Sequence, residues 1–458
     1  MRIALLSNVT VEVLAGMLKK GHDIWTPPGF GSWMETALSP SDDLKVFDPE
    51  AIFLMLDSSH GRYDALSVPN AVAALESSFP GATVVVPDLE DLADEVGSFY
   101  DEGMWKLGSM PWSMKGLRAI RTEIDRLIGA MKGNRKKVLA LDFDNTLWEG
   151  VIGEDGVAGI KPFTEFQKEL KSLKDRGVLL VALTKNNPAD VEPVWEDDRM
   201  ALKKDDFVEL RIDWNDKADN LVASAKALNL GTDSYVFVDD NPAEREQMKA
   251  LHPEVAVPDF PISIRRISRL YFPAFRLTEE DKRKTEQYHA EAARRNYGAG
   301  LTAEEYLRGL EIWTEIHPIR EDEITRVAQL SQKTNQFNVC TNRYTESDIR
   351  RFMESPDHLI VTLHAGDRFG DQGLVAFVHV CNDEICDWVM SCRAMNRRIE
   401  YTVQEWVEKA LRERGSSKVK ATWRKTLKNA PVKELFERFG FTKTNETEEM
   451  KNYERILA

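Results

Sequence analysis

The chain has the sequence VLALDFDNTLWEGVIGEDG from Val138 to Gly156, an apolar run that leads into two aspartates, Asp142 and Asp144. The run predicts a buried strand, and residues two apart in a strand share a face, so both carboxylates can reach one reacting group. One carboxylate could attack phosphorus while the other gives and takes protons. Free amides of the following turn could hold phosphoryl oxygens. The segment indicates phosphoryl chemistry, although solvated loops also carry such pairs.

Further polar side chains follow two later strands and precede one later helix. They are Thr184 and Lys185 after the predicted strand Val178–Leu183, Lys217 before the predicted helix Ala218–Leu228, and Asp239 and Asp240 after the predicted strand Tyr235–Val238. The carboxyl ends of strands in a β-α-β-α-β series form one crevice. A hydroxyl and an ammonium suit phosphate, whereas carboxylates suit Mg²⁺, which needs oxygen ligands. Singly, these residues could be a turn hydroxyl, a solvated charge and helix caps; together they predict one site.

This segment resembles the haloacid dehalogenase-like (HAD) phosphatases, whose four motifs match the residues quoted above. The resemblance implies a Rossmann-like parallel sheet without a large cap, with Asp142 as nucleophile and Asp144 as acid and base. It implies phosphate ligands at Asn145, Thr146, Thr184, Lys185 and Lys217, and Mg²⁺ held by Asp142, Asp144 (through its carbonyl), Asp239 and Asp240. An open site of this kind would suit a bulky substrate, even one presented by another protein. A small phosphorylated substrate is expected as well.

Length and charge limit the other classes of function. The 458 residues predict two or three domains. The net charge of −15, from 76 acidic and 61 basic residues, argues against general binding of nucleic acid or anionic membranes. Four cysteines without CxxC spacing indicate reduced thiols, and no stretch approaches the roughly 18 apolar residues of a membrane span. We therefore expect a cytoplasmic protein.

The predicted organisation is a small α/β domain over 1–132, the HAD-like domain over 133–262, a helical linker over 263–302 and an α+β domain over 303–458. The first domain resembles a degenerate SGNH-hydrolase-like region, with predicted strands at 3–6, 51–56 and 82–86. Its Ser7, Asp57 and His60 could suggest a hydrolase, but no glycine-flanked nucleophile turn accompanies them, so we assign them no chemistry.

The last third predicts antiparallel strands with helices to one side. Capping boxes at 302–305 and 345–348 mark helix starts. The predicted strands are 358–364, 373–380, 385–390 and 419–423, and the predicted helices are 401–414 and 432–439. This order is similar to the GCN5-type acyltransferases, which hold a pantetheine arm in a splayed pair of strands.

Three motifs of this domain, KTNQFN at 333–338, DRFGD at 367–371 and SCR at 391–393, together with DFDNTLW, resemble the FkbH-like family. That resemblance implies transfer of a glyceryl group from 1,3-bisphosphoglycerate to an acyl carrier protein, with phosphate release, in polyketide, capsule or related biosynthesis. It makes Cys392 the candidate acyl carrier. Candidate substrate ligands are Asn335, Gln336, Arg368, Asp371 and Arg393.

Two observations keep alternatives open. Free cysteines are often only buried packing residues, so Cys392 has a structural interpretation as well. The pyrophosphate loop Arg-x-x-Gly-x-Gly of such acyltransferases has Asn396 and Arg398 here in place of its glycines, which argues against coenzyme A. The alternative function is a Mg²⁺-dependent phosphomonoester hydrolase whose C-terminal domain only binds substrate.

Overall fold

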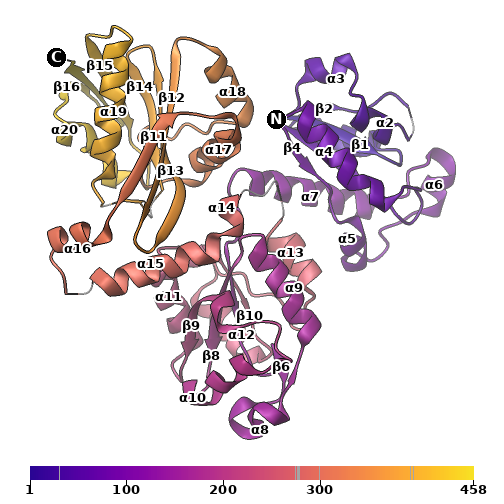
Figure 1. The fold of residues 1–458 in the computed structure, drawn as a ribbon. Helices are drawn as coiled ribbons and strands as arrows, with labels where there is room; N and C mark the ends of the chain where they lie inside the picture. Colours follow the sequence, from indigo (N-terminus) through magenta and orange to yellow (C-terminus); the bar gives the residue numbers. More distant parts are fainter. Residues whose placement is uncertain are drawn as a thin grey trace. The chain divides into compact units, whose positions relative to one another are not determined.

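A computed structural model describes residues 1–29, 31–273, 275, 279–298, 300–391, 394–395 and 397–457. The chain divides into two compact units, one formed by 1–78 with 83–289 and the other by 79–82 with 290–458. Figure 1 shows the elements of each unit along the chain. The structure is α/β with parallel sheets in the first unit and a mixed sheet in the second, which confirms the predicted fold class.

The first α/β region is built on a parallel sheet in the order β2-β1-β3-β4. Its strands are β1 (Arg2–Ser7), β2 (Asp23–Trp25), β3 (Ala51–Met55) and β4 (Thr83–Val85). Its helices are α1 (Glu12–Leu18), α2 (Trp33–Leu38), α3 (Asp42–Phe47), α4 (Val68–Ser78), α5 (Leu89–Glu95), α6 (Glu102–Gly108) and α7 (Met114–Met131). Ser7 and Asp57 form hydrogen bonds within this region. The Ser7 hydroxyl donates to the Met55 carbonyl, and Asp57 accepts from the Trp112 indole.

The second region of this unit has a parallel sheet in the order β10-β5-β8-β9. Its strands are β5 (Val138–Leu141), β8 (Leu179–Thr184), β9 (Phe207–Ile212) and β10 (Tyr235–Val238), with the short hairpin β6 (Trp148–Glu149) and β7 (Lys161–Pro162). Its helices are α8 (Ile152–Gly159), α9 (Thr164–Asp175), α10 (Pro188–Val191), α11 (Lys217–Ala227), α12 (Pro242–Leu251) and α13 (Ile264–Tyr271). The sequence had not predicted β9, which places Lys217 after a strand end as well.

Both faces of this sheet are covered, which explains why its strands are continuously apolar. In β5, Leu139 and Leu141 pack into one hydrophobic cluster, whereas Val138 and Ala140 pack into the cluster on the other face. Successive side chains of a strand point to opposite faces, so no position within β5 is left for a polar group. Polar residues therefore occur only where the strands end.

The second unit contains a sheet in the order β11-β12-β13-β14-β15-β17-β16, in which only the β14–β15 pairing is parallel among the pairings described. The strands are β11 (Trp313–Pro318), β12 (His358–Asp367), β13 (Gly370–Cys381), β14 (Glu384–Met390), β15 (Lys418–Arg424), β16 (Thr442–Glu446) and β17 (Met450–Ile456). The helices of the linker and of this unit are α14 (Glu279–Lys282), α15 (Lys284–Gly298), α16 (Ala303–Leu310), α17 (Ile324–Lys333), α18 (Glu346–Glu354), α19 (Ile399–Glu413) and α20 (Leu435–Arg438).

The expectation of helices on one side of this sheet is wrong. Ile324 of α17 and Ile349 of α18 pack with Ile360 of β12 in one cluster. Val403 of α19 packs with Val361 of β12 in another. Because residues 360 and 361 point to opposite faces, helices cover both faces of the sheet. The capping boxes predicted at Thr302 and Thr345 are present.

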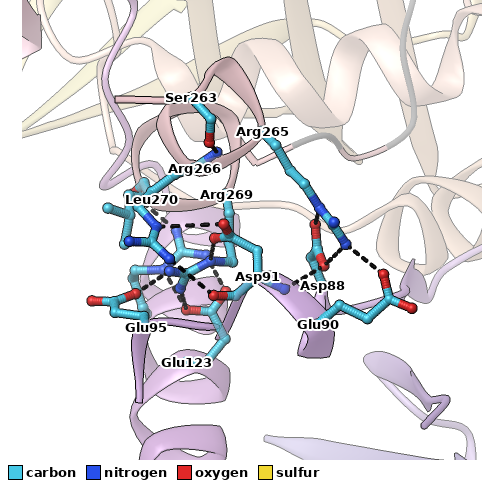
Figure 2. A network of polar contacts seen from close by, with 11 residues as sticks. Asp88, Glu90, Asp91, Glu95, Glu123, Ser263, Arg265, Arg266, Arg269 and Leu270 are labelled. Atoms are coloured by element: carbon cyan, nitrogen blue, oxygen red, sulfur yellow. Dashed lines mark hydrogen bonds and ion pairs between the residues drawn. The ribbon is translucent and has the colours of Figure 1, made fainter. Parts of the chain in front are cut away.

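Within the first unit, α13 is joined to α5 and α7 by a cluster of ion pairs (Figure 2). Arg269 contacts Asp91, Glu95 and Glu123, and its Nη1 lies 3.3 Å from Glu123 Oε2. The side chains of Arg269, Asp91 and Glu123 are 4%, 7% and 4% exposed. At the edge of the cluster, Arg265 makes two 2.6 Å hydrogen bonds to Asp88. The buried part of the cluster ties residues after β10 to the first region of the unit.

We expect Arg269→Ala to lower the free energy of unfolding of this unit by up to about 3–5 kcal/mol, because it removes the most buried cation of the cluster and leaves Asp91 to Arg266 and Glu123 to Arg126, which are both more exposed. Arg265→Ala is the matched control, since the Arg265 side chain is 50% exposed and its pairs should contribute about 0–1 kcal/mol. Urea unfolding followed by tryptophan fluorescence measures both. Equal losses of unfolding free energy in the two variants would show that the buried ion pairs contribute no more to stability than the exposed ones.

Candidate active site

Three charged side chains meet at the carboxyl ends of β5 and β10. The Lys217 ammonium lies 2.9 Å from Asp142 Oδ1 and 2.6 Å from Asp239 Oδ2. All three side chains are at most 8% exposed. Asp142 directly follows β5, Asp239 directly follows the neighbouring strand β10, and Lys217 begins α11. The structure thus brings together residues that are up to 97 positions apart in the sequence, at the edge where the sequence predicted them.

One ammonium in this cluster faces more than one carboxylate. Burial, with the neighbouring Asp239, raises the pKa of Asp142 to about 6 even though Lys217 opposes the shift. Burial also raises the pKa of Asp239 and of Asp240. Burial opposes the charge of Lys217, but the two carboxylates outweigh it and raise the pKa of the ammonium. The site therefore has an excess of negative charge that a further cation would relieve.

Asp144 is held in one orientation by three donors. Its Oδ1 accepts from the Trp148 indole at 2.9 Å and from the Ile152 amide at 3.0 Å. Its Oδ2 accepts from the Asn186 amide nitrogen at 3.0 Å, and that nitrogen also lies 3.0 Å from Thr184 Oγ1. The sequence interpretation had assigned no role to Trp148 or Asn186. Trp148 lies within the stretch quoted at 138–156 and Asn186 directly follows Lys185, but nothing in the sequence alone shows that Asp144 is their partner.

Four of the five predicted phosphate ligands, all except Thr146, line one pocket of about 370 Å³. Its lining residues are Asp142, Asp144, Asn145, Thr184, Lys185, Lys217, Asp240, Asn241, Pro242 and Glu244. Asn145 adopts a left-handed conformation with φ of 53°, and its side chain accepts from the Gly150 amide at 3.1 Å. That conformation turns the chain sharply after Asp144, as Asn tolerates better than most residues.

The remaining predicted phosphate ligands differ in their partners. Lys185 lies 2.7 Å from Glu244 and 3.7 Å from Asp216, so it is paired within the pocket wall. Thr146 is buried, and its hydroxyl has no hydrogen-bond partner among the described residues. Buried hydroxyls normally have a partner. Thr146 is not among the residues that line the pocket.

The helix-cap interpretation of the second acidic pair is wrong, because Asn241 caps α12 instead. Its side chain accepts from the Ala243 amide at 2.9 Å. Asp239 Oδ1 accepts from the Asn241 amide at 2.9 Å, and Arg245 donates to the carbonyls of Asp239 and Asp240 at 2.7 Å each. Of the pair, Asp240 lines the pocket, whereas Asp239 is fully buried with its Oδ2 against Lys217.

The donor set suits a hard cation. Ligand oxygens of Asp142, Asp239 and Asp240 lie within 4.8 Å of one another. Carboxylate oxygens are what Mg²⁺ prefers, and it usually keeps several waters besides one or two carboxylates. The three carboxylates and the excess negative charge fit such an ion.

Of the predicted substrate ligands of the second unit, Asn335, Gln336, Arg368 and Asp371 lie among the described residues. Cys392 and Arg393 lie outside the described residues. Asn335 accepts from Arg343, and Asp371 accepts from the Gly373 amide at 2.8 Å. Arg368 stacks on aromatic rings, 5.2 Å from the centroid of Tyr297. Gln336 is exposed, as are Asn335, Arg368 and Asp371.

The gap between β14 and β15 is occupied by the chain itself. These strands pair only at Glu384 with Lys420 and at Ile385 with Ala421. Beyond that point the buried segment 337–340 lies between them. The three main-chain hydrogen bonds run from Val339 N to Trp388 O (3.2 Å), from Met390 N to Phe337 O (3.0 Å) and from Arg424 N to Val339 O (2.8 Å). The last two residues of the motif at 333–338, Phe337 and Asn338, belong to this segment, which lies where pantetheine was expected.

Comparisons with known proteins give no family. No family model matches the chain, and no curated protein matches it. Among solved structures, the N-terminal part of a Bacteroides fragilis protein, containing a phosphatase domain complexed with Mg, is 23% identical with a TM-score of 0.45, covering 59% of this chain and 93% of that one. The ribosomal-protein-S18-alanine N-acetyltransferase of Escherichia coli is 14% identical with a TM-score of 0.25, covering 32% and 95%.

A third structure, the GNAT domain of S. lividans PAT, is 17% identical with a TM-score of 0.26 and covers 31% of this chain and 90% of its own. Likeness of this degree establishes neither family nor activity. Among the described residues, no helix is long and apolar enough to cross a membrane.

The raised pKa of Asp142 predicts a pH dependence of stability in chelator-treated protein. Folding favours the protonated carboxyl, so this contribution is fully present below the unfolded pKa of 3.8 and is lost as pH rises toward about 6. Between pH 4 and 6 this contribution lowers the free energy of unfolding, so the slope for the wild type should be more negative than the slope for Asp142→Asn by up to about one proton. Urea unfolding in EDTA across this range measures it. Identical slopes for the two proteins would contradict the shift.

Proposed function

We propose that this protein is a Mg²⁺-dependent phosphoryl-processing enzyme in which Asp142 is the nucleophile. The observation that carries the proposal is the contact of Lys217 with both Asp142 and Asp239 at the wall of a polar pocket. A buried lysine between two carboxylates fixes the direction of each, and Asp142 is left at the point where a phosphoryl group would enter. The experiment that tests it is substitution of Asp142, described below.

The residues account for a balanced reaction of a phosphomonoester. An Asp142 oxygen forms a bond to phosphorus as the bond from phosphorus to the leaving oxygen breaks, and Asp144 gives that oxygen its proton. Asp144 then takes a proton from water, whose oxygen attacks the aspartyl phosphate and frees phosphate and the Asp142 carboxylate. The donors to Asp144 from Trp148, Ile152 and Asn186 keep it directed during both steps.

Other pocket residues would bind the phosphoryl oxygens. Thr184 supplies a hydroxyl, Lys217 supplies a buried cation, and the turn at Asn145 supplies amides. Lys185 would join them at the rim, where Glu244 holds it. When bound by Asp142, Asp144 (through its carbonyl), Asp239 and Asp240, Mg²⁺ would neutralise the negative charge that gathers on the phosphoryl group.

The finer proposal is glyceryl transfer from 1,3-bisphosphoglycerate to an acyl carrier protein. A thiolate, Cys392 by resemblance, attacks the acyl carbonyl; a C–S bond forms and the C–O bond to phosphate breaks, releasing phosphate. The remaining phosphomonoester is then a substrate for Asp142, and the carrier's phosphopantetheine thiol accepts the glyceryl group by thioester exchange. The sequence motifs support this proposal. Because the segment 337–340 fills the gap between β14 and β15, the pantetheine arm would bind elsewhere on this unit.

We expect Asp142→Asn to lower kcat for phosphate release from a phosphomonoester by at least about 10³-fold, since it removes the nucleophile and a metal ligand together. EDTA should abolish the wild-type activity and Mg²⁺ should restore it. Asp198→Asn, the same chemical change on an exposed residue, should leave kcat unchanged. Near wild-type turnover by Asp142→Asn would refute the assignment.

Intact-mass measurement after incubation with 1,3-bisphosphoglycerate separates the two candidate functions. A glyceryl or phosphoglyceryl adduct that disappears in Cys392→Ala supports the transferase. Cys386→Ala is the control and should keep the adduct, because burial raises the pKa of the Cys386 thiol to about 12 and leaves it unreactive. Phosphate release that needs Asp142 but gives no adduct and does not depend on Cys392 supports the simple hydrolase instead.

A further inference from the structure

Two histidines and a glutamate meet on the second unit, away from every residue used above. His317 lies on the edge strand β11 and His364 on its neighbour β12, whose register pairs His317 with Thr362. Residues two apart in a strand share a face, so His317, Thr362 and His364 lie on one face of the sheet. Glu323 comes from the turn just before α17, which packs on that face. The fold therefore brings the three side chains together from separate elements.

The Glu323 carboxylate is oriented by its own partners. Its Oε2 accepts from the Arg320 amide at 2.9 Å and from the Thr362 hydroxyl at 3.1 Å. Its Oε1 lies 2.6 Å from His364 Nε2 and 3.5 Å from His317 Nε2. One oxygen is thus fixed by two donors while the other points at two imidazole nitrogens. Metal-ligating carboxylates are commonly held by such outer hydrogen bonds.

The tautomer of His317 follows from its other ring nitrogen. His317 Nδ1 lies 2.9 Å from the Pro318 carbonyl, which can only accept, so Nδ1 carries the proton. In the neutral imidazole Nε2 then has the free lone pair, and this buried atom has no hydrogen-bond partner among the described residues. An imidazole fixed by a bond from Nδ1 to a backbone carbonyl, with Nε2 aimed at a carboxylate, is the arrangement of a metal ligand.

Strand β12 is irregular at His364. The pairing of β12 with β13 shifts register on both sides of this residue. Such bulges redirect a side chain and are frequent beside functional sites. The His364 ring stacks against that of His317, with centroids 5.6 Å apart and planes at 26°. The bulge therefore presents the second imidazole beside the first.

The distances agree with one small ion. The ligand atoms of His317, Glu323 and His364 lie within 4.8 Å of one another. Tetrahedral ligands at about 2.0–2.1 Å from a zinc ion are about 3.3 Å apart, and the two nitrogen–oxygen separations here lie on either side of that value. Glu315, whose Oε1 is 3.6 Å from His317 Nε2, is near enough to contribute a further oxygen.

We propose that His317, Glu323 and His364 form a binding site for a divalent transition metal of the zinc class. Two imidazoles and one carboxylate select such an ion over Mg²⁺, which prefers oxygen ligands throughout. Three protein ligands leave one coordination position open to water or a small anion. The site is separate from the aspartyl pocket in residues and in metal preference, and its existence does not depend on the proposed function.

The test uses the full chain stripped with chelator and then kept in excess Mg²⁺, which occupies the carboxylate pocket. Zn²⁺ titration by calorimetry and Co²⁺ titration by visible absorption should each show one equivalent bound with micromolar or tighter affinity. His317→Gln, His364→Gln and Glu323→Gln should each weaken binding at least 10-fold, and Thr362→Val, which only loosens Glu323, about 10-fold. His289→Gln, on α15, is the matched control and should bind as wild type.

Two further measurements keep the result unambiguous. Asp142→Asn should retain the Zn²⁺ equivalent, which separates this site from the proposed catalytic one. Thermal melting and far-ultraviolet circular dichroism show whether each histidine variant is folded, and the conservative Thr362→Val tests the site where a histidine variant is not. No bound equivalent in the wild type, or one that survives all four substitutions at the site, would overturn the proposal.

Discussion

The candidate site depends on one lysine ammonium buried between two carboxylates. Lys217 contacts Asp142 and Asp239, and without it two acidic groups would face each other in a desolvated position. Burying unpaired charge is so costly that such groups normally neutralise or move. Because Lys217 begins α11 while Asp142 and Asp239 directly follow two strands, the ion pairs also fix that helix against the ends of the sheet. The chemistry and the local architecture therefore rest on the same three side chains.

The parallel sheet explains how those residues come together. Its strands β5, β8 and β10 are buried on both faces, so the interior of each is apolar and polar side chains are confined to the ends. Adjacent parallel strands end at the same edge, and Asp142, Thr184 and Asp239 consequently line up there. This arrangement is why a short run such as LALDFD carries so much information: the change from apolar to acidic marks both a strand end and a place in the site.

The strands that are uninterrupted apolar runs could be predicted from the sequence. Edge strands in which polar residues alternate with apolar ones could not. β5, β8 and β10 are uninterrupted apolar runs and were predicted within a residue or two. β9 was missed because Glu209 and Arg211 interrupt its apolar pattern, as partly exposed edge strands allow. β11 was missed for a similar reason, since polar residues alternate along an exposed edge strand. Without β11, no sequence argument could have placed His317 beside His364.

The hydrogen-bond partners of side chains were harder to predict from the sequence than the strands. That Asn186 and Trp148 hold Asp144 depends on tertiary contacts between segments up to 42 positions apart. The roles of the predicted phosphate and metal ligands remain proposals, as do the domain boundaries and the role of Cys392. The family resemblance implies substrate binding by Asn335 and Gln336 of the motif at 333–338, whereas Phe337 and Asn338 of the same motif accept hydrogen bonds through their backbone carbonyls.

The segment 337–340 also limits how a long, flexible ligand can dock. Three main-chain hydrogen bonds hold it between β14 and β15, and the Asn429 side chain donates to the Asn338 carbonyl at 3.0 Å. At about 0.5–1.5 kcal/mol net for each bond, a competitor would forfeit roughly 2–6 kcal/mol of affinity before making any contact of its own. An intruding arm would also have to expose Val339, which is fully buried. The segment 337–340 thus already occupies the gap between β14 and β15. Selectivity against free cofactors that carry a similar flexible arm would follow from this packing.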